Sequence, residues 1–344
     1  MADNDKDQSN KSLLSAAAIG VGKTVVSLRQ KKEEPKLVGQ IVLITGGSRG
    51  LGLLLSHEFA RQGAKIVICA RDEQELAQAR QQLEERGAEV MAIPCDITDR
   101  VQAQNMIQQA TEAFGRIDIL VNNAGIITVG PLMAQTLEDF REAMDIMFWG
   151  MFYTTMAVLP QMLDRKEGRI VNITSIGGKV SVPHLLPYDS AKFAAVGFSE
   201  GLRAEMAKEG VKVITIAPGL MRTGSEINAY FKGNNRKEYT WFTVLGSLPV
   251  LSMSAEKAAQ KIVQATYRGS AEAILGFPAK MLAKFHGLFP GATTGILGLI
   301  NRFLPGAGPV WGLERHTGKE SETPVTQSFI TGSTQKAAQE YNQT

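Results

Sequence analysis

Short apolar runs alternate with longer amphipathic segments from Gln40 onward. The β-branched runs at residues 41–45 and 65–70 predict buried strands, and further strands are predicted at residues 89–96, 117–125, 168–175, 211–219 and 272–277. Helical segments of ten or more residues separate these runs; the first ends at Arg61 and the second at Gly87. Such alternation implies right-handed βαβ units. The pattern therefore predicts an α/β fold, a doubly wound parallel seven-stranded sheet flanked by helices.

The pattern changes on both sides of this predicted domain, which spans residues 39–278. Residues 1–38 are polar and charged, which predicts an N-terminal arm or linker. Residues 279–313 carry apolar positions at helical spacing and predict an apolar helical C-terminal extension. Two amphipathic helices packed on the domain, a lid over the substrate and a membrane-facing surface all fit this spacing. Residues 314–344 are rich in Ser, Thr, Gln, Lys and Glu, which predicts disorder.

Composition narrows the function classes. A net charge of +3 over 344 residues does not indicate an extended nucleic-acid footprint. Cys69 and Cys95 form no CxxC pair, which favours a reducing compartment and a cytoplasmic location, and four histidines and two separated cysteines give no metal-ligand cluster. The mildly apolar stretch at residues 13–28 is shorter than the roughly 20 residues of a spanning helix, so membrane association at a surface is the alternative that remains.

A glycine-rich loop follows the first predicted strand. In "TGGSRGLG" (45–52), Gly46, Gly50 and Gly52 stand where a backbone turns tightly and meets a diphosphate at a helix N-terminus. Free N–H groups and partial positive charge favour an anion there. A plain glycine-rich turn is the alternative, but the strand before and the helix after the loop favour a Rossmann-type dinucleotide site.

The end of the second strand bears on the choice of cofactor. NAD-preferring sites place an acid about 20 residues beyond the glycines to bind the ribose hydroxyls. Here the strand ends on Ala70, Arg71 follows, and Arg49 lies in the glycine loop. Both cations suit a 2′-phosphate, which predicts NADP(H). Alternatively, Arg71 is a solvated residue at the start of a helix, where Asp72 would serve as N-cap.

A tyrosine and a lysine four residues apart suggest proton transfer. Tyr188 and Lys192 share one face of a predicted helix, and Ser175 lies at the end of the fifth strand. An ammonium beside the phenol would lower the pKa of Tyr188, which is ordinarily about 10, and make it a usable acid and base. A serine hydroxyl could hydrogen-bond the substrate oxygen.

Together these motifs resemble the short-chain dehydrogenase/reductase (SDR) family. "CDITD" (95–99), "NNAG" (122–125) and "PGLMRT" (218–223) complete the set, in the family's order and spacing from about Gly39 to Glu272. The residues of these motifs are most similar to those of NADP-preferring members, such as carbonyl reductases and the 11β-hydroxysteroid dehydrogenase type. The family's members commonly form homodimers or homotetramers, and the resemblance implies the same here.

The resemblance implies roles for individual residues. The catalytic group would be Ser175, Tyr188 and Lys192. The cofactor-binding residues would be Gly46, Ser48, Arg49, Gly50, Leu51, Gly52, Arg71, Asp96, Ile97, Asn123, Ala124, Gly125, Tyr188, Lys192, Pro218, Gly219 and Thr223. No metal is implied.

One family position is altered. Family members usually carry an asparagine three residues before a glycine on the helix after "NNAG", where it holds a water that relays protons from the lysine. Here that glycine is Gly150 and the position is Met147, whose thioether is a poor hydrogen-bond partner. Either a water or a carbonyl completes the relay, or turnover is slow and the protein binds or senses the cofactor.

The segment at residues 224–251 is expected to cover the substrate. Its aromatic residues suggest an apolar pocket wall, and His184 is expected to be a pocket or loop residue because Tyr188 fills the acid/base role. The sequence thus predicts an oxidoreductase that transfers a hydride between NADP(H) and an apolar ketone, aldehyde or secondary alcohol. The alternative is an NADP(H)-binding regulatory or scaffold protein with weak or no turnover.

Overall fold

A computed structural model describes residues 36–308, 312–328 and 331–343. Most of the predicted arm and the apolar stretch at residues 13–28 lie outside this part of the chain, as do residues 309–311, 329–330 and 344. The described residues belong to one compact unit that begins at Lys36.

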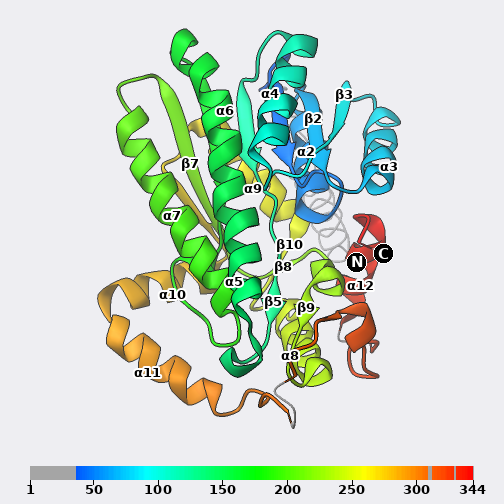
Figure 1. Cartoon of the computed structure of the whole chain (residues 1–344), viewed down its shortest axis with the longest axis vertical. Helices are drawn as coiled ribbons and strands as arrows, with labels where there is room; N and C mark the ends of the chain where they lie inside the picture. Colours follow the sequence, from blue (N-terminus) through cyan, green and yellow to red (C-terminus); the bar gives the residue numbers. More distant parts are fainter. Residues whose placement is uncertain (1–35, 309–311, 329–330, 344) are drawn as a thin grey trace, which may run out of the picture. The chain divides into compact units, whose positions relative to one another are not determined.

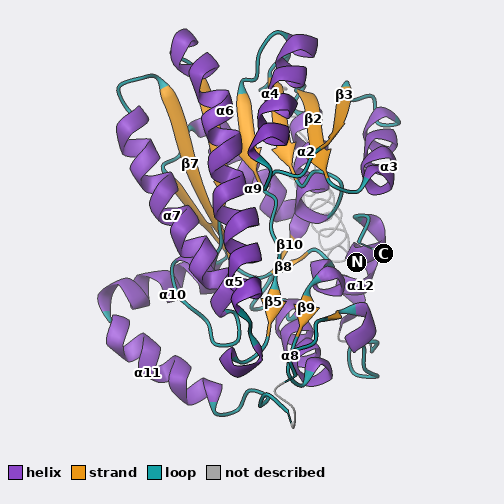
Figure 2. Ribbon diagram, viewed as in Figure 1, coloured by secondary structure: helices purple, strands orange, loops and turns teal. Residues whose placement is uncertain are grey.

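The centre of this unit is a seven-stranded sheet in the order β11-β7-β6-β4-β1-β2-β3. Figure 2 shows strands of this sheet in orange between the helices. Every neighbouring pair runs parallel, which confirms the predicted doubly wound sheet. The strands are β1 (Ile41–Thr45), β2 (Lys65–Ala70), β3 (Val90–Pro94), β4 (Ile119–Asn122), β6 (Gly168–Ile173), β7 (Val211–Pro218) and β11 (Glu272–Leu275). The strand order reverses between β1 and β4, and α/β sheets bind ligands at this point.

Helices cover both faces of the sheet (Figure 1). One face packs against α2 (Gly50–Arg61), α3 (Glu73–Glu84) and α9 (Ala255–Arg268). The other packs against α4 (Arg100–Phe114), α6 (Gly150–Arg165) and α7 (Leu186–Met206). Because both faces are covered, the central strands are mostly apolar; all five residues of β1 are buried.

A π-helical turn joins two of the long helices. It spans Asp145–Trp149 and connects α5 (Leu137–Met144) to α6, so residues 137–165 form one continuous helix. This helix is long and apolar enough to cross a membrane by length and composition alone, but half of its most apolar window is buried within the protein. Core helices of soluble proteins meet the same criterion.

Smaller elements lie beyond the carboxyl ends of the main strands. Two short sheets pair β5 (Thr128–Val129), β9 (Tyr230–Phe231) and β12 (His316–Thr317), and β8 (Met221–Arg222) with β10 (Met253–Ser254). The helix α8 (Asn235–Ser247) follows β9, and Figure 1 shows it beside these short strands. Short 3-10 turns occupy Leu132–Ala134, Ile176–Gly178, Ser225–Asn228 and Lys319–Ser321.

The apolar extension forms two helices, α10 (Phe277–Leu288) and α11 (Pro290–Asn301). Each of these helices buries a single residue, Ala279 in α10 and Thr293 in α11. Most of their large apolar side chains are therefore exposed.

The C-terminal tail differs from the disorder predicted for it. Its described part contains β12, which pairs with β9, and the helix α12 (Gly332–Glu340). Ala337, Ala338 and Tyr341 are buried. A narrow stripe of small apolar residues, too weak to stand out in a polar segment, is enough to dock this helix because the domain supplies the complementary surface.

Candidate active site

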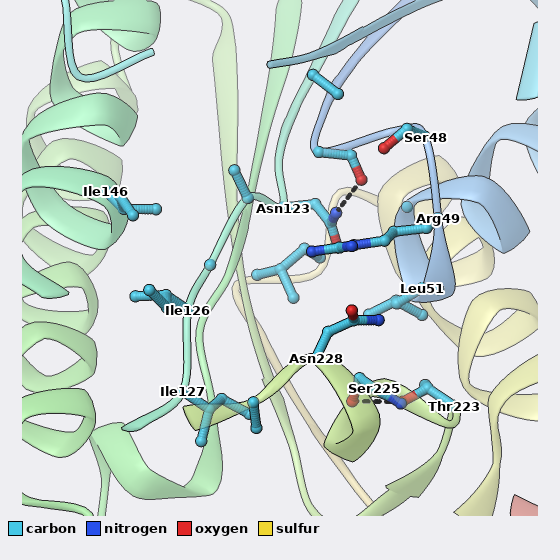
Figure 3. Close-up of a pocket in the computed structure, with 18 of the residues that line it drawn as sticks. Ser48, Arg49, Leu51, Asn123, Ile126, Ile127, Ile146, Thr223, Ser225 and Asn228 are labelled. Atoms are coloured by element: carbon cyan, nitrogen blue, oxygen red, sulfur yellow. Dashed lines mark hydrogen bonds between the residues drawn. The ribbon is translucent and has the colours of Figure 1, made fainter. Parts of the chain in front are cut away.

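A cavity of about 690 Å³ lies at the carboxyl edge of the sheet. It is bordered by the loops after β1, β2, β3, β4, β6 and β7. All of the residues assigned to catalysis or cofactor binding from the sequence line this one cavity. Figure 3 shows Ser48 and Arg49 on one side, Thr223, Ser225 and Asn228 on another, and Ile126, Ile127 and Ile146 as an apolar border.

Gly46 and Gly52 of the glycine loop leave no room for a side chain. A Cβ on Gly52 would collide with the carbonyl oxygen of Gly46, and one on Gly46 would lie 3.0 Å from Cα of Ala124. Gly46 also has a φ of 62°, which L side chains rarely adopt. Asn123 Nδ2 fixes the loop by donating to the carbonyls of Thr45 (3.0 Å) and Gly46 (3.1 Å). This bare backbone, at the N-terminus of α2, fits the diphosphate of a dinucleotide.

Charged groups gather where the loop meets α3. Arg49 Nη1 donates to Glu75 Oε1 at 2.8 Å, and Ser48 Oγ donates to Glu75 Oε2 at 3.1 Å. Arg71 also lines the cavity. Asp72 caps α3 by accepting from the backbone of Gln74 and Glu75, the role expected of it. A 2′-phosphate here would therefore meet two guanidinium groups and also the carboxylates of Asp72 and Glu75, which line the cavity as well.

Three side chains meet at the other end of the cavity. Ser175 follows β6, and its Oγ accepts from the Gly177 N–H at 3.0 Å. Tyr188 lies in the first turn of α7 and hydrogen-bonds with Ser175. Lys192, one turn later, donates from Nζ to the Ile173 carbonyl at 2.9 Å and lies 5.7 Å from the centre of the Tyr188 ring. The helical spacing of Tyr188 and Lys192 thus brings them to one place with Ser175.

The pKa of Tyr188 differs from the expected lowering. Burial raises it to about 12, the hydrogen bond with Ser175 opposes this rise, and the charge of Asp189 adds to it. The Lys192 ammonium does not offset this rise, and its Nζ donates to the Ile173 carbonyl. Burial also lowers the pKa of Lys192 to about 8. Tyr188 is therefore a proton donor at neutral pH, and Lys192 loses its charge in mildly alkaline solution.

Met147 lies in the π-helical turn and is buried against Ile126, Tyr188 and Ala191. A Cβ on Gly125 would lie 3.6 Å from Sδ of Met147 and 3.8 Å from Nζ of Lys192, so both side chains reach this glycine. Within the described residues, Ile146 rather than Met147 lines the cavity.

The expected aromatic wall is mostly a small core of its own. Phe231 and Tyr239 are buried together, with Trp241 and Phe242 packed against them, while Tyr230 alone of the segment's aromatic residues borders the cavity. His184 pairs with Glu238 (Nδ1 to Oε1, 2.9 Å) and is absent from the cavity lining. This pair supports the wall and does not reach the substrate space.

Several lining residues were not identified from the sequence. They include Glu75, Ile126, Ile127, Ile146, Ser225, Asn228 and Gln343. Ile126 and Ile127 directly follow "NNAG", so continuation of that loop could have indicated them. Nothing in the local sequence marks Gln343, which reaches the site only through the docking of α12.

The family is shown by comparison with known proteins. The model of the short chain dehydrogenase family matches residues 40–231, which contain the glycine loop and the Ser175, Tyr188 and Lys192 group. The chain belongs to the short-chain dehydrogenase family. Members of this family are oxidoreductases that use a nicotinamide cofactor, NAD or NADP.

Individual relatives agree with this assignment. The short-chain dehydrogenase matches Dehydrogenase/reductase SDR family protein 7-like of Anopheles gambiae with 38% identity, over 60% of this chain and 67% of that protein. It matches 17-beta-hydroxysteroid dehydrogenase 13 of Mus musculus with 33% identity, over 56% of this chain and 64% of the relative. Dehydrogenase/reductase SDR family member 7B of Mus musculus is 30% identical over 77% of this chain and 82% of its own.

A solved structure supports the same fold. The crystal structure of a short-chain dehydrogenase from Streptomyces avermitilis superposes with a TM-score of 0.66 at 27% identity. The match covers 80% of this chain and 99% of the other.

Proposed function

We propose that this short-chain dehydrogenase transfers a hydride between NADP(H) and an apolar ketone, aldehyde or secondary alcohol, with Tyr188 as general acid and base. The proposal rests on one observation: Ser175, Tyr188 and Lys192 line the same cavity as the glycine loop. A bound nicotinamide would supply the redox chemistry. The residues of this chain would then bind the cofactor, orient the substrate and transfer the proton.

The proton step follows from the environment of Tyr188. Its pKa of about 12 keeps the phenol protonated at neutral pH, so it can donate to a carbonyl oxygen during reduction. Ser175, already hydrogen-bonded with Tyr188, would polarise the same oxygen. Lys192 would bind the nicotinamide ribose and stabilise the phenolate formed when the proton leaves.

The preference for NADP(H) is supported by charge. Arg49 and Arg71 line the cavity beside Ser48, whose hydroxyl can donate to a phosphate. The acid that would bind ribose hydroxyls is replaced by Ala70 at the end of β2. The substrate is proposed to be apolar because Ile126, Ile127, Ile146 and Tyr230 border the catalytic end.

A screen of ketones, aldehydes and quinones with NADPH or NADH tests this proposal. We expect NADPH oxidation with an apolar carbonyl, and a loss of at least about a thousandfold in Tyr188→Phe because the proton donor is gone. The phenylalanine keeps the ring packing, so unchanged NADPH affinity in the variant would locate the loss in the chemical step. Absence of NADPH and NADH binding by the wild-type protein would overturn the proposal.

A regulatory or scaffold protein that binds NADP(H) is the second candidate. Met147 favours it, because its thioether lies against Gly125, as the Lys192 ammonium does, where a polar relay group is expected. This candidate predicts tight NADPH binding without turnover of any carbonyl in the screen.

We also propose a homodimer or homotetramer and contact with a membrane surface. Large apolar side chains on the helices around the site are exposed, among them Trp149, Met156 and Phe193, and could be covered by a second copy. The apolar helices α10 and α11 support membrane contact, and a cytoplasmic location is proposed with it.

A further inference from the structure

The end of the chain lies against the glycine loop. The Gly50 N–H, the first of α2, donates to the Tyr341 carbonyl at 2.8 Å. Asn342 Nδ2 donates to the Ser48 carbonyl at 3.3 Å. Residues almost 300 positions apart in the sequence therefore meet where a diphosphate would be bound.

The side chain of Gln343 enters the cavity lining. Asn228 Nδ2 donates to its backbone carbonyl (2.8 Å) and to its Oε1 (2.7 Å). With Oε1 held in this way, Nε2 is directed at the glycine loop, where a Cβ on Gly50 would collide with it. Gln343 is only 7% exposed, so the amide is a fixed group and not a mobile terminus.

Packing elsewhere holds this segment in place. Ala337, Ala338 and Tyr341 are buried, and the Tyr341 hydroxyl donates to Glu256. Gln82 Nε2 donates to Asn342 Oδ1 at 2.7 Å, which ties the segment to α3 as well. These contacts lie outside the cavity, so they fix the segment whether or not a ligand is bound.

We propose that Gln343 is a binding residue for the cofactor diphosphate and that the segment Tyr341–Gln343 closes this side of the site. The inference rests on the proposed function. The segment takes one N–H donor, that of Gly50, and supplies the amide Nε2 of Gln343 next to it. An amide donor suits a diphosphate oxygen, and such charge-assisted hydrogen bonds are stronger than neutral ones.

The volume of the cavity indicates whether the segment blocks the site or only borders it. With the segment in place the cavity still measures about 690 Å³ and still reaches every predicted cofactor residue. Ligand pockets commonly measure about 300–1,000 Å³. The segment therefore leaves a cavity of ligand size open beside it, while its Tyr341 carbonyl takes the Gly50 N–H.

Binding titrations of the full-length protein with NADPH test this inference. Gln343→Ala should raise the Kd for NADPH about tenfold, the value expected for loss of one hydrogen bond to a charged group. Gln343→Glu keeps the acceptor for Asn228 but replaces the donor with an anion, so its Kd should rise further. Gln339→Ala, at an exposed position of α12 just before this segment, is the matched control and should bind as the wild type does.

A ligand that lacks the diphosphate tests whether the effect of Gln343 is specific to that group. Adenosine 2′-monophosphate should bind all four proteins equally, because it does not reach Gln343. Equal NADPH affinity in the wild type, Gln343→Ala and Gln343→Glu overturns the inference while leaving the proposed function intact. Tighter NADPH binding in Gln343→Ala also overturns it and shows that the segment acts as a plug. If the wild type binds neither NADPH nor NADH, the proposed function fails as well.

Discussion

At the scale of single residues, the environment of Lys192 is the most unusual feature of the site. Burial lowers its pKa to about 8, and its neighbour at the relay position is the thioether of Met147. A family asparagine would hold a relay water here, whereas the Lys192 ammonium of this chain donates to the carbonyl of Ile173. The sequence identified this substitution, but only the structure shows how Lys192 is satisfied without it.

Met147→Asn should therefore shift the pH dependence of turnover. An amide oxygen beside Lys192 favours its charged form and raises its pKa. If activity requires the charged form, the variant should stay active to a higher pH than the wild type. We expect the alkaline limb of the kcat profile to move up by about one pH unit, measured between pH 6 and 10. Met147→Leu keeps the apolar volume and should leave the limb where it is. Identical profiles for the two variants would show that Lys192 does not control this limb.

Glu75 is expected to act on the proposed cofactor preference through Arg49. It accepts from both Arg49 and Ser48, the two loop residues proposed for the 2′-phosphate. Glu75→Gln removes the negative charge that competes with the phosphate while it preserves the shape of the side chain. We expect NADPH to bind roughly 3- to 10-fold more tightly and NADH to bind unchanged, since only NADPH carries the phosphate.

Glu73→Gln is the control for Glu75→Gln, because Glu73 lies in the same first turn of α3 but does not line the cavity. Equal changes in the Kd of NADPH and NADH in Glu75→Gln would contradict the assignment of this region to the 2′-phosphate.

At the scale of elements, the long strands were predictable and the short ones were not. The ranges 41–45 and 65–70 match β1 and β2, because a buried parallel strand is a continuous apolar run bounded by turn residues. The short strands β5, β8, β9, β10 and β12 have two residues each and no pattern of their own. They form because tertiary contacts bring their backbones together, which local sequence does not encode.

The glycine loop illustrates which part of the site the sequence could predict. Its spacing, with a strand before it and a helix after it, was sufficient to locate it because the backbone itself performs the function. Gln343 and Asn228 depend instead on where α12 and the turn after β8 dock, and their residue types are common in loops. Such contacts between distant segments require the structure.

Gly52→Ala tests the close approach within that loop. The new Cβ would meet the Gly46 carbonyl, a backbone group that cannot move without opening the junction of β1 and α2. We expect loss of measurable NADPH binding by titration and a decrease of about 2–4 kcal/mol in the free energy of unfolding by urea denaturation.

Gly197→Ala in α7 is the control for Gly52→Ala, since nothing lies within 4 Å of its Cβ position. It should be neutral or stabilise by about 0.5–1 kcal/mol. Normal NADPH binding by Gly52→Ala would show that the loop is more adaptable than its contacts indicate.

At the scale of the whole chain, α10 and α11 form a surface unlike the rest of the described protein. Phe277, Leu288 and Phe303 are 76%, 73% and 84% exposed, and further large apolar side chains lie between them. Lys280, Lys284 and Arg302 are exposed in the same stretch, and residues 277–313 contain no Asp or Glu. The apolar side chains match the acyl region of a membrane, and the cations match its anionic surface.

Vesicle co-sedimentation tests this surface directly. The wild type should sediment with vesicles that contain phosphatidylserine and should be released in part by salt, because Lys280, Lys284 and Arg302 contribute electrostatically. A triple variant, Phe277→Glu, Leu288→Glu and Phe303→Glu, should remain in the supernatant, since it removes apolar area and adds repulsion. Leu137→Glu, at an equally exposed apolar position outside α10 and α11, should sediment like the wild type. Recovery of the wild type in the supernatant would contradict membrane binding and would indicate that protein covers the exposed helices. If the triple variant then also showed a lower apparent mass than the wild type, the covering protein would be a second copy of the chain.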